Sequence, residues 1–379
     1  MKKILSTILL FLLACVCLAQ DPQLTQFYNN PIYLNPSNTG GTKNGRLIFN
    51  YRTQWPGITN LTTSLFSFDY FVPLPDHHTA IGVGVLFMDD QAGQNLKLQR
   101  TSAQVAVSIE KLMWGNWRIK GGFQFGYLSR KIASDGENLT FEDQLIFGTT
   151  NSQDLIQGSS GESKQSPDVS IGTLIGSPNF WIGFAAHHLN TPDQSLISSG
   201  FSGDVQPLPV KWTLHTGFEY RLPNKGSKPL SAIRMEGMYM KQGNNEQFIT
   251  GMNYLIGFNR SKKIGKRFMD HAHHSAADIS FSFGLWFRAI PLFTKHDQVK
   301  ISADAISGQI GFETELIAGF SIGANYSYDF NISSLDLAQA HEVSLTVRTK
   351  QFFKILNRNC KKPLTWSERH QHPFNRSNL

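Results

Sequence analysis

The sequence has few cysteines, few charged residues and almost no long apolar runs. Only 3 of its 379 residues are cysteine, and two of them, Cys15 and Cys17, lie close to the N-terminus. If that region is removed, Cys360 is the only thiol and no intrachain disulfide is possible. A mean hydropathy of −0.24 with a single long apolar run argues against a bundle of transmembrane helices. With 40% hydrophobic and 17% charged residues, the chain is also too apolar for a disordered protein.

The single long apolar run has the features of a secretory signal peptide. Two lysines precede the apolar stretch from Ile4 to Val16, and a small residue, Ala19, stands before Gln20. Cleavage after Ala19 would make residues 1–19 the signal peptide. The run Leu12-Leu13-Ala14-Cys15 is an alternative, because it has the form of a lipobox and Cys15 would then become a lipidated N-terminus. Both interpretations predict export.

The positive charge is concentrated in two segments. The signal peptide carries two lysines and no acid, so the mature chain falls from +7 to +5. Residues 260–271 carry a net +4 and residues 350–379 a net +6, which leaves a mildly acidic remainder. This distribution argues against a basic nucleic-acid-binding surface and predicts two basic appendages as a contact region. The predicted contact residues are Lys262, Lys263, Lys266, Arg267, Lys361 and Lys362.

Beyond Asn44 the sequence alternates with a period of two. Large apolar residues alternate with small or polar ones at residues 119–127, 212–220, 279–287 and 320–328. Strict alternation indicates β-strands. A soluble β-sandwich also alternates, but its strands average about five or six residues, whereas tilted membrane-crossing strands need about 9–11. The segments here are of the longer kind, and aromatic residues such as Trp117, Tyr127, Tyr220 and Trp286 stand near their ends, as interfacial girdles require.

We therefore predict an all-β fold, a transmembrane antiparallel β-barrel of about 14 strands in the outer membrane. The predicted domains are the signal peptide (1–19), a periplasmic N-terminal segment or plug (20–45), the barrel (46–350) and a basic periplasmic tail (351–379). An even strand count places both termini on one side, by convention the periplasm. The long links 130–167 and 189–209 then face outward, and the basic link 259–277 faces the periplasm. The expected strands lie near 46–53, 62–72, 79–89, 98–110, 117–129, 168–177, 180–188, 210–221, 229–240, 246–258, 278–287, 298–314, 319–330 and 341–350.

The segment before the barrel differs from the rest in composition. Residues 21–36 are rich in Asn, Pro and aromatic residues. A plug in the barrel or a clasp on its periplasmic end would suit this composition, whereas a flexible linker would usually carry fewer aromatics.

Alternation also assigns faces to several charged residues. Asp69 and Asp329 fall on inward faces, where a carboxylate can be paired or solvated. Arg52 could pair with Asp69 on the adjacent strand and act as a structural lock. Alternatively, the Trp55-Pro56-Gly57 run forms a turn at the extracellular rim that faces a partner.

The residues provide no convincing catalytic, cofactor or metal site. His271, His273 and His274 form the densest histidine cluster, but in a polar loop such a cluster is more often solvated than metal-bound. The pairs His77-His78 and His187-His188 lie at strand ends, where alternation points neighbours to opposite faces, so we interpret them as rim residues. No Walker or dinucleotide-binding motif is present, and Gly82 and Gly84 fall within a strand on the lumen face. The sequence predicts neither an enzyme nor a bound cofactor.

A series of short motifs resembles the PorP/SprF family of the type IX secretion system. The series covers nearly all of the mature chain. Its members are Gln20-Asp21-Pro22-Gln23, Asn30 to Pro36, Tyr51 to Ile58, Ser67 to Tyr70, Met88 to Gly93, Gly122 to Gln124, Phe184 to Asn190, Leu285 to Arg288, Tyr326 to Phe330 and His341 to Leu345. The sequence departs from the family's plain form at His187 and Phe287, in the 259–277 link and in the long tail.

The resemblance implies an accessory outer-membrane barrel of the type IX secretion and gliding machinery of Bacteroidota. Such a barrel docks or supports the export and surface attachment of adhesin-type cargo through the cargo's C-terminal domain, with periplasmic ring proteins and outer-membrane lipid as further partners. An outer-membrane diffusion channel for small solutes is the alternative from another class. The residues that the matched motifs mark as structural or partner-facing are Asn35, Pro36, Arg52, Trp55, Pro56, Gly57, Asp69, Asp89, Gly93, Asn190, Tyr328 and Asp329.

Overall fold

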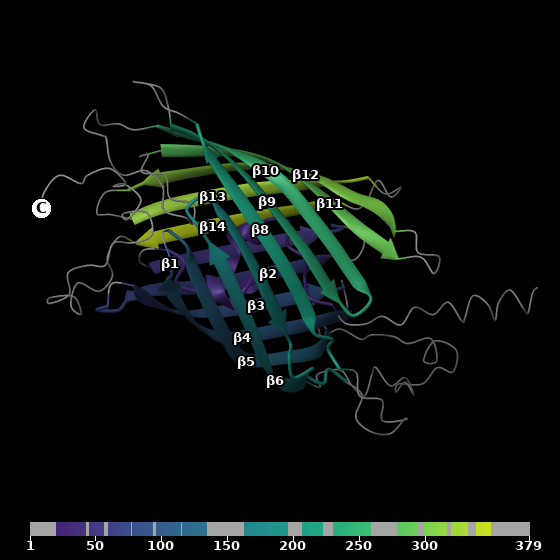
Figure 1. Ribbon diagram of the computed structural model, residues 1–379. Helices are drawn as coiled ribbons and strands as arrows, with labels where there is room; N and C mark the ends of the chain where they lie inside the picture. The colour runs from purple at the N-terminus through teal and green to yellow at the C-terminus, as the bar shows by residue number, and fades with distance from the viewer. Residues whose placement is uncertain are drawn as a thin grey trace, which may run out of the picture.

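The structure, a computed structural model, describes residues 20–42, 45–56, 60–76, 78–93, 96–114, 116–134, 163–195, 207–222, 230–258, 279–293, 299–316, 320–332 and 339–349. Fourteen antiparallel strands form a closed barrel, in which β1 pairs with β14 and every other strand pairs with its neighbours in sequence (Figure 1). The predicted fold class and strand number are confirmed. The strands are β1 (Gly45–Gln54), β2 (Leu61–Pro73), β3 (Thr79–Ala92), β4 (Leu96–Leu112), β5 (Arg118–Ser134), β6 (Ser163–Gly176), β7 (Phe180–His187), β8 (Lys211–Arg221), β9 (Leu230–Gln242), β10 (Asn245–Phe258), β11 (Ile279–Phe293), β12 (Val299–Glu315), β13 (Phe320–Asn331) and β14 (Ala340–Thr349).

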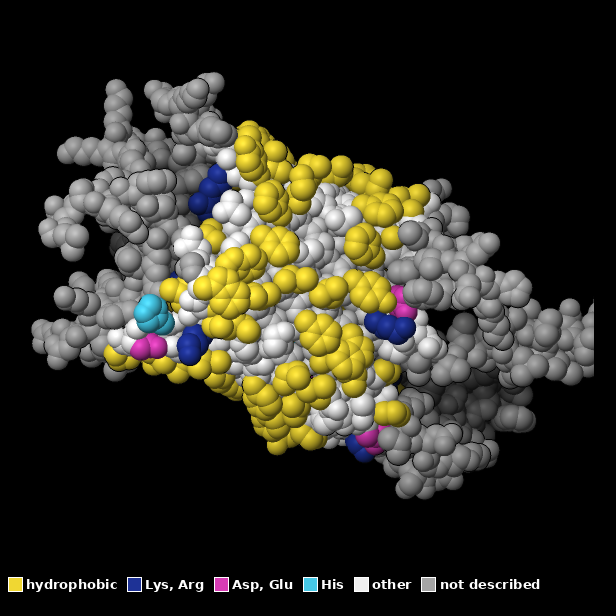
Figure 2. All heavy atoms as spheres, viewed as in Figure 1, with side chains coloured by type: hydrophobic (Ala, Val, Ile, Leu, Met, Phe, Trp, Pro, Cys, Tyr) yellow, Lys and Arg dark blue, Asp and Glu magenta, His cyan; other side chains and the backbone are white. Residues whose placement is uncertain are grey.

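The alternation in sequence becomes an alternation of exposure along each strand. On β8, Trp212 and Leu214 are exposed on the outer face, and Thr213, His215 and Glu219 are buried in the interior. On the face that Figure 2 shows, hydrophobic side chains are spread over the middle of the barrel, and the charged side chains lie near its two ends. A charge in the middle of this apolar band would cost a few kcal/mol in a bilayer. The outer surface is therefore suited to hydrocarbon.

The barrel has two distinguishable ends. Because the strands are antiparallel and even in number, β1 begins and β14 ends at the same end, which we call the terminal end; the opposite end is the far end. β10 finishes at Phe258 at the terminal end as well. The basic segments 259–277 and 351–379, with all six basic contact residues, lie outside the described residues, as do the signal peptide with Cys15 and the histidines at 77, 271, 273 and 274.

Several strands extend further toward the far end than the sequence predicts. β5 continues to Ser134 and β6 begins at Ser163, so the expected link 130–167 is shortened on both sides. Exposed residues of these extensions, such as Lys131 and Gln165, are polar. An apolar alternation cannot reveal a strand that continues past the hydrocarbon layer. Of the 189–209 link, residues 189–195 and 207–209 are described, and Asp193 pairs with Pro207 in an isolated bridge.

Residues 20–42, which we call the luminal segment, lie inside the barrel (Figure 1, purple). They contain three short helices, η1 (Phe27–Asn29), α2 (Pro31–Leu34) and η2 (Pro36–Asn38). Proline opens α2 and η2, where its missing N–H costs no hydrogen bond. None of the helices in the described ranges has the length and apolarity that crossing a membrane requires.

Two apolar clusters hold the luminal segment against the wall. Trp286, on β11, is 1% exposed and belongs to the first, where its ring stacks on Tyr28 at 4.6 Å between centroids. Trp286 is therefore not an interfacial girdle residue, because its position in the alternation turns it inward. The first cluster is Phe27, Tyr28, Leu34, Met238, Ile249 and Trp286. The second is Leu24, Ile32, Leu65, Leu86 and Ala106.

Candidate functional site

The luminal segment contacts the barrel wall on every side. Hydrogen bonds, ion pairs, ring stacking or apolar packing join it to each of the fourteen strands. Each strand contributes at least one wall residue to these contacts. In order from β1 to β14, these residues are Arg52, Asp69, Leu86, Arg100, Lys120, Thr173, Phe184, Lys211, Gln242, Gln247, Trp286, Gln309, Asp329 and Glu342. A segment of 23 residues therefore connects all parts of the wall through the interior.

Arg52 ties the luminal segment to the seam where the barrel closes. Its Nη2 lies 2.7 Å from Asp329 Oδ2 on β13, and its Nη1 lies 3.1 Å from Glu342 Oε2 on β14. The same Nη1 donates to Thr25 Oγ1 at 2.8 Å. The side chains of Arg52, Asp329 and Glu342 are 1% exposed or less. Loss of one partner from such a buried cluster leaves an uncompensated charge, so removal of any one of the three charges should destabilise the fold strongly.

The expected pair between Arg52 and Asp69 is wrong. In the β1–β2 register Asp69 lies opposite Arg46, six residues from Arg52. Asp69 accepts from Arg46 Nε at 2.9 Å and Nη2 at 2.8 Å, and from the backbone N–H of Gly40 at 2.7 Å. Alternation predicts that both side chains face inward, and they do, but register depends on the link between the strands, which alternation does not determine.

Asn35 and Pro36 are held against glycines on the wall. Asn35 Nδ2 donates to the carbonyls of Thr173 at 3.0 Å and Phe184 at 3.2 Å, while its Oδ1 caps η2. A Cβ on Gly122 would overlap the backbone of Pro36. The wall at this point is shaped for close backbone approach, which only glycine permits.

Asp21, near the start of the luminal segment, is held by three cations near the far end. Its Oδ1 accepts from Arg100 Nη2 at 2.9 Å; its Oδ2 accepts from Lys211 Nζ at 2.5 Å and His188 Nε2 at 2.9 Å. The backbone N–H of Asp21 donates to Gln242 Oε1 at 2.9 Å. Burial alone would raise the pKa of Asp21, but the charges of His188, Lys211 and Arg100 outweigh it and hold the pKa well below its usual range.

His188 bridges two carboxylates. Its Nε2 faces Asp21, and its Nδ1 lies 2.8 Å from Asp168 Oδ1. Carboxylates only accept, so both ring nitrogens carry protons and the ring is a cation. Burial would lower the pKa of His188, but Asp21 and Asp168 raise it above its ordinary value. His187 and His188 do not point to opposite faces as expected: both are buried, because His188 has left-handed backbone (φ 59°) that turns its side chain inward.

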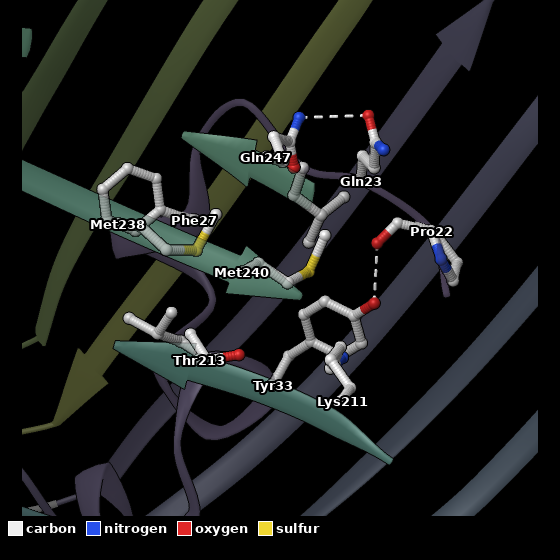
Figure 3. Close-up of a pocket in the computed structure, with 11 residues that line it drawn as sticks. Pro22, Gln23, Phe27, Tyr33, Lys211, Thr213, Met238, Met240 and Gln247 are labelled. Atoms are coloured by element: carbon white, nitrogen blue, oxygen red, sulfur yellow. Dashed lines mark hydrogen bonds between the residues drawn. The ribbon is translucent and has the colours of Figure 1, made fainter. Parts of the chain in front are cut away.

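A small cavity lies between the luminal segment and strands β8 and β9 (Figure 3). Tyr33 stands at its edge, with its hydroxyl donating to the Pro22 carbonyl at 2.7 Å and Lys211 Nζ 4.2 Å from its ring centroid. Gln247 donates to Gln23 Oε1 at 3.0 Å on the other side. The volume of about 20 Å³ has room for one water and not for an organic cofactor.

Strained backbone gathers at the far end. Trp55 (φ 52°) and Asn60 (φ 45°) belong to the β1–β2 link, and His188 and Thr191 (φ 42°) to the β7–β8 link. Gly93, in the β3–β4 link, has φ 113°. Left-handed backbone is uncommon for bulky and β-branched residues, and such strain concentrates where a loop performs a function. Among the links that the structure describes, those at the terminal end have no residue with positive φ.

The remaining motif residues also lie toward the far end. Asp89, on the outer face of β3, accepts from the side chains of Gln91, Gln99 and Thr101. Asn190 joins the β7–β8 link to β6 through the backbone of Val169 and Pro167. Pro56 follows Trp55 in its turn, and Tyr328 makes edge contacts with Phe330 and His341. Gly57 lies outside the described residues.

The structure thus divides the predicted motif residues into two groups. Asn35, Pro36, Arg52, Asp69 and Asp329 belong to or contact the luminal segment, while the other motif residues that the structure describes gather toward the far end. Sequence reasoning missed the Asp21 anchor. Asp21 bonds to residues 79 and 167 positions away, and a single sequence carries no signal for such pairing.

The described interior holds the luminal segment among buried polar and charged side chains. No group of three or more His, Cys, Asp or Glu residues in the described ranges is arranged for a metal ion. Many buried charges of the wall pair with one another, as Arg52 does with Asp329, and Asp21 of the luminal segment pairs with Arg100 and Lys211.

Comparisons with known proteins identify one protein family and several similar solved structures. The family model described as "Type IX secretion system membrane protein PorP/SprF" matches residues 16–347. Among solved structures, the chain is similar to a TodX deltaS2S3 mutant monoaromatic hydrocarbon channel (10% identity, 83% of this chain and 92% of that chain, TM-score 0.47). It is also similar to a Pseudomonas aeruginosa FadL homologue (11%, 83% and 92%, TM-score 0.45) and to BamA from Haemophilus ducreyi lacking POTRA domains 1–3 (10%, 80% and 70%, TM-score 0.39). No curated protein matches the chain.

Proposed function

The chain belongs to the PorP/SprF family of type IX secretion system membrane proteins, and from that membership we propose that this outer-membrane barrel is a noncatalytic docking component. It holds a secreted, adhesin-type protein at its far end through that protein's C-terminal domain. The far end then faces the cell exterior, and the terminal end faces the periplasm.

The observation that carries this proposal is the contact of the luminal segment with all fourteen strands. A diffusion channel needs a continuous water-filled path with polar walls. Here many inward-facing side chains of the wall are buried, and the apolar cluster around Trp286 packs Phe27, Tyr28 and Leu34 of the segment against the wall. A barrel built in this way supports binding at its ends better than passage through its centre.

The far end is the better candidate for the secreted partner. Its described links carry Trp55, Asn60, His188 and Thr191 in left-handed backbone, a strain that the rest of the fold maintains. Trp55 is 39% exposed in the turn for which a partner-facing role was the alternative interpretation of the sequence. An exposed tryptophan on a fixed turn is a typical anchor of a protein interface.

The terminal end is the candidate for periplasmic contacts. Both basic segments, 259–277 and 351–379, follow strands that finish at this end. Their positive charge would attract an acidic surface of a periplasmic ring protein and accelerate encounter. Lys262, Lys263, Lys266, Arg267, Lys361 and Lys362 would carry that contact.

Conductance separates docking from the alternative of a solute channel. The full chain, inserted in a planar bilayer, is expected to show no large steady conductance because the luminal segment occupies the interior. A steady open pore in the unmodified protein would overturn the docking proposal in favour of the channel.

Affinity capture tests the docking itself, with a matched pair of tryptophan variants. Trp55→Ala alters the far end, and Trp114→Ala alters an exposed tryptophan (64%) in the β4–β5 link at the terminal end. We expect the tagged barrel to retain secreted proteins with a shared C-terminal domain, and Trp55→Ala to lose them while Trp114→Ala keeps them. Heat-modifiable gel mobility confirms that both variants fold. Equal retention by the two variants would contradict docking at the far end.

A further inference from the structure

We propose that Arg100, His188 and Lys211 form a carboxylate-binding site at the far end of the lumen. Asp21 fills the site in this structure, and an acidic, extended segment of the docked secreted protein takes its place. The inference rests on the proposed docking function, and it names the chemistry of the segment that the barrel recognises.

The site is built to hold one carboxylate from several directions. Its three cations come from β4, from the link after β7 and from β8, and each lies within 2.9 Å of Asp21. The side chains of Arg100, His188 and Lys211 are 7%, 6% and 3% exposed. Buried donors that converge on both oxygens of one carboxylate are the arrangement that recognises a carboxylate ligand.

Without Asp21, the site has one more positive charge than its neighbouring carboxylates balance. Asp168 accepts from His188 at 2.8 Å, and Asp90 lies opposite Arg100 in the β3–β4 register. When the Asp21 carboxylate leaves, one positive charge remains uncompensated in a buried position. An unpaired buried charge is costly, so the empty site favours an incoming carboxylate.

The luminal segment is held differently along its length. Residues 20–26 are fixed mainly by ion pairs and hydrogen bonds, through Asp21, Thr25 and Gln26, with Leu24 as their apolar contact. Residues 27–41 are clamped by stacked rings and by close packing on glycines. Exchange of the first part for a ligand of the same chemistry can therefore leave the second part seated.

The same site is connected to the proposed docking surface. His188 holds Asp21 and begins the β7–β8 link, in which Leu189 and Asn190 are exposed. Two of the four residues of this link from His188 to Thr191 have left-handed backbone. A partner that contacts the link acts directly on the residue that holds the internal carboxylate.

The internal occupant identifies a suitable probe. Residues 20–26 read Gln-Asp-Pro-Gln-Leu-Thr-Gln. The probe is a fluorescent heptapeptide of this sequence with an amidated C-terminus, and its control carries Asn in place of Asp. The receptor is the barrel without residues 1–26, purified in detergent, and binding is measured by fluorescence anisotropy.

We expect the Asp heptapeptide to bind about tenfold or more tightly than the Asn heptapeptide, since hydrogen bonds to a charged group contribute about that factor. Arg100→Gln and Lys211→Gln should each remove the preference. Lys241→Gln is the matched control, because Lys241 pairs with Glu246 at the same end of the barrel and does not contact Asp21. Equal affinity for the two peptides, or no binding to a folded receptor, would overturn the proposal.

A second measurement tests the proposal if the barrel without residues 1–26 does not fold. It uses the barrel without residues 1–19, with the substitution Cys360→Ser and a fluorophore attached at the Gln20→Cys position. The added Asp heptapeptide should displace the labelled residues and lower the anisotropy of the label, and the Asn heptapeptide should not. Identical responses to the two peptides again contradict the site. If Trp55-dependent capture persists while the peptides show no preference, this inference fails alone. If no secreted protein is captured while the preference is present, the docking function fails and the acidic ligand must be sought elsewhere.

Discussion

Removal of the Arg52 charge should destabilise the barrel at its closing seam. The Arg52→Met substitution keeps much of the side-chain volume but leaves Asp329 and Glu342 without their shared cation. Breaking one partner out of a buried ion cluster costs about 3–5 kcal/mol. Asp329 retains Arg288 at 2.9 Å, so we expect a loss toward the lower end of that range.

A pair of double-mutant cycles identifies which carboxylate, Asp329 or Asp69, interacts with Arg52. Arg52→Met combined with Asp329→Asn should show a coupling energy of about 2–3 kcal/mol, because the two groups are in contact. Arg52→Met combined with Asp69→Asn should be additive within about 0.5 kcal/mol. Asp69 lies six residues along the ladder from Arg52, which is roughly 20 Å at about 3.3 Å per residue.

The free energy of unfolding in urea, followed by tryptophan fluorescence in lipid vesicles, provides these values. Lys131→Met serves as the control, since Lys131 is exposed and its removal should change stability by less than about 0.5 kcal/mol. A coupling energy near zero between Arg52 and Asp329, or a coupling of more than about 1 kcal/mol between Arg52 and Asp69, would refute the reasoning.

Three further predictions concern the wall and the β7–β8 link. Gly122→Val should cost about 1–3 kcal/mol and expose the luminal segment to protease, whereas Gly121→Val, where an added Cβ meets nothing within 4 Å, should do neither; equal cleavage of both would contradict the close packing. Val107→Arg, on the outer face, should lower the unfolding free energy in vesicles by about 2–4 kcal/mol, and an unchanged value would remove Val107 from the hydrocarbon layer. Two carboxylates raise the pKa of His188 above its value in the unfolded chain. The contribution of the His188 cation to the free energy of unfolding is therefore complete below about pH 6.5 and is lost as pH rises through the raised pKa. Unfolding free energy measured across this range should therefore fall with rising pH, and His188→Gln should flatten the fall.

The barrel itself could be predicted from the sequence because one physical constraint repeats along the chain. Each strand that faces lipid on one side must alternate, and this pattern gave the type and number of the strands and their approximate bounds. Beyond the hydrocarbon layer this constraint no longer applies, and for this reason the sequence did not predict that β5 continues to Ser134. The inward faces of Asp69 and Asp329 followed from the same alternation.

The contacts inside the barrel could not be predicted in the same way. Arg52 meets Asp329 and Glu342 because the barrel closes, and closure brings together residues 277 and 290 positions apart. The burial of both His187 and His188 depends on a single left-handed residue, which alternation treats as extended. Composition indicated that residues 21–36 were unusual, but the partners of Asp21 required the three-dimensional arrangement.

The position of the luminal segment in the chain has a consequence for biogenesis. It precedes β1 and is synthesised first, yet Thr25 and Gln26 bond to Glu342 on the last strand, 317 and 316 residues later. Contacts of such sequence separation form late in folding. The segment can complete its bonds only when β14 has arrived and paired with β1. A truncated or misassembled barrel would thus leave its own N-terminus accessible to periplasmic proteases, so seating of the first residues reports that the last strand is in place.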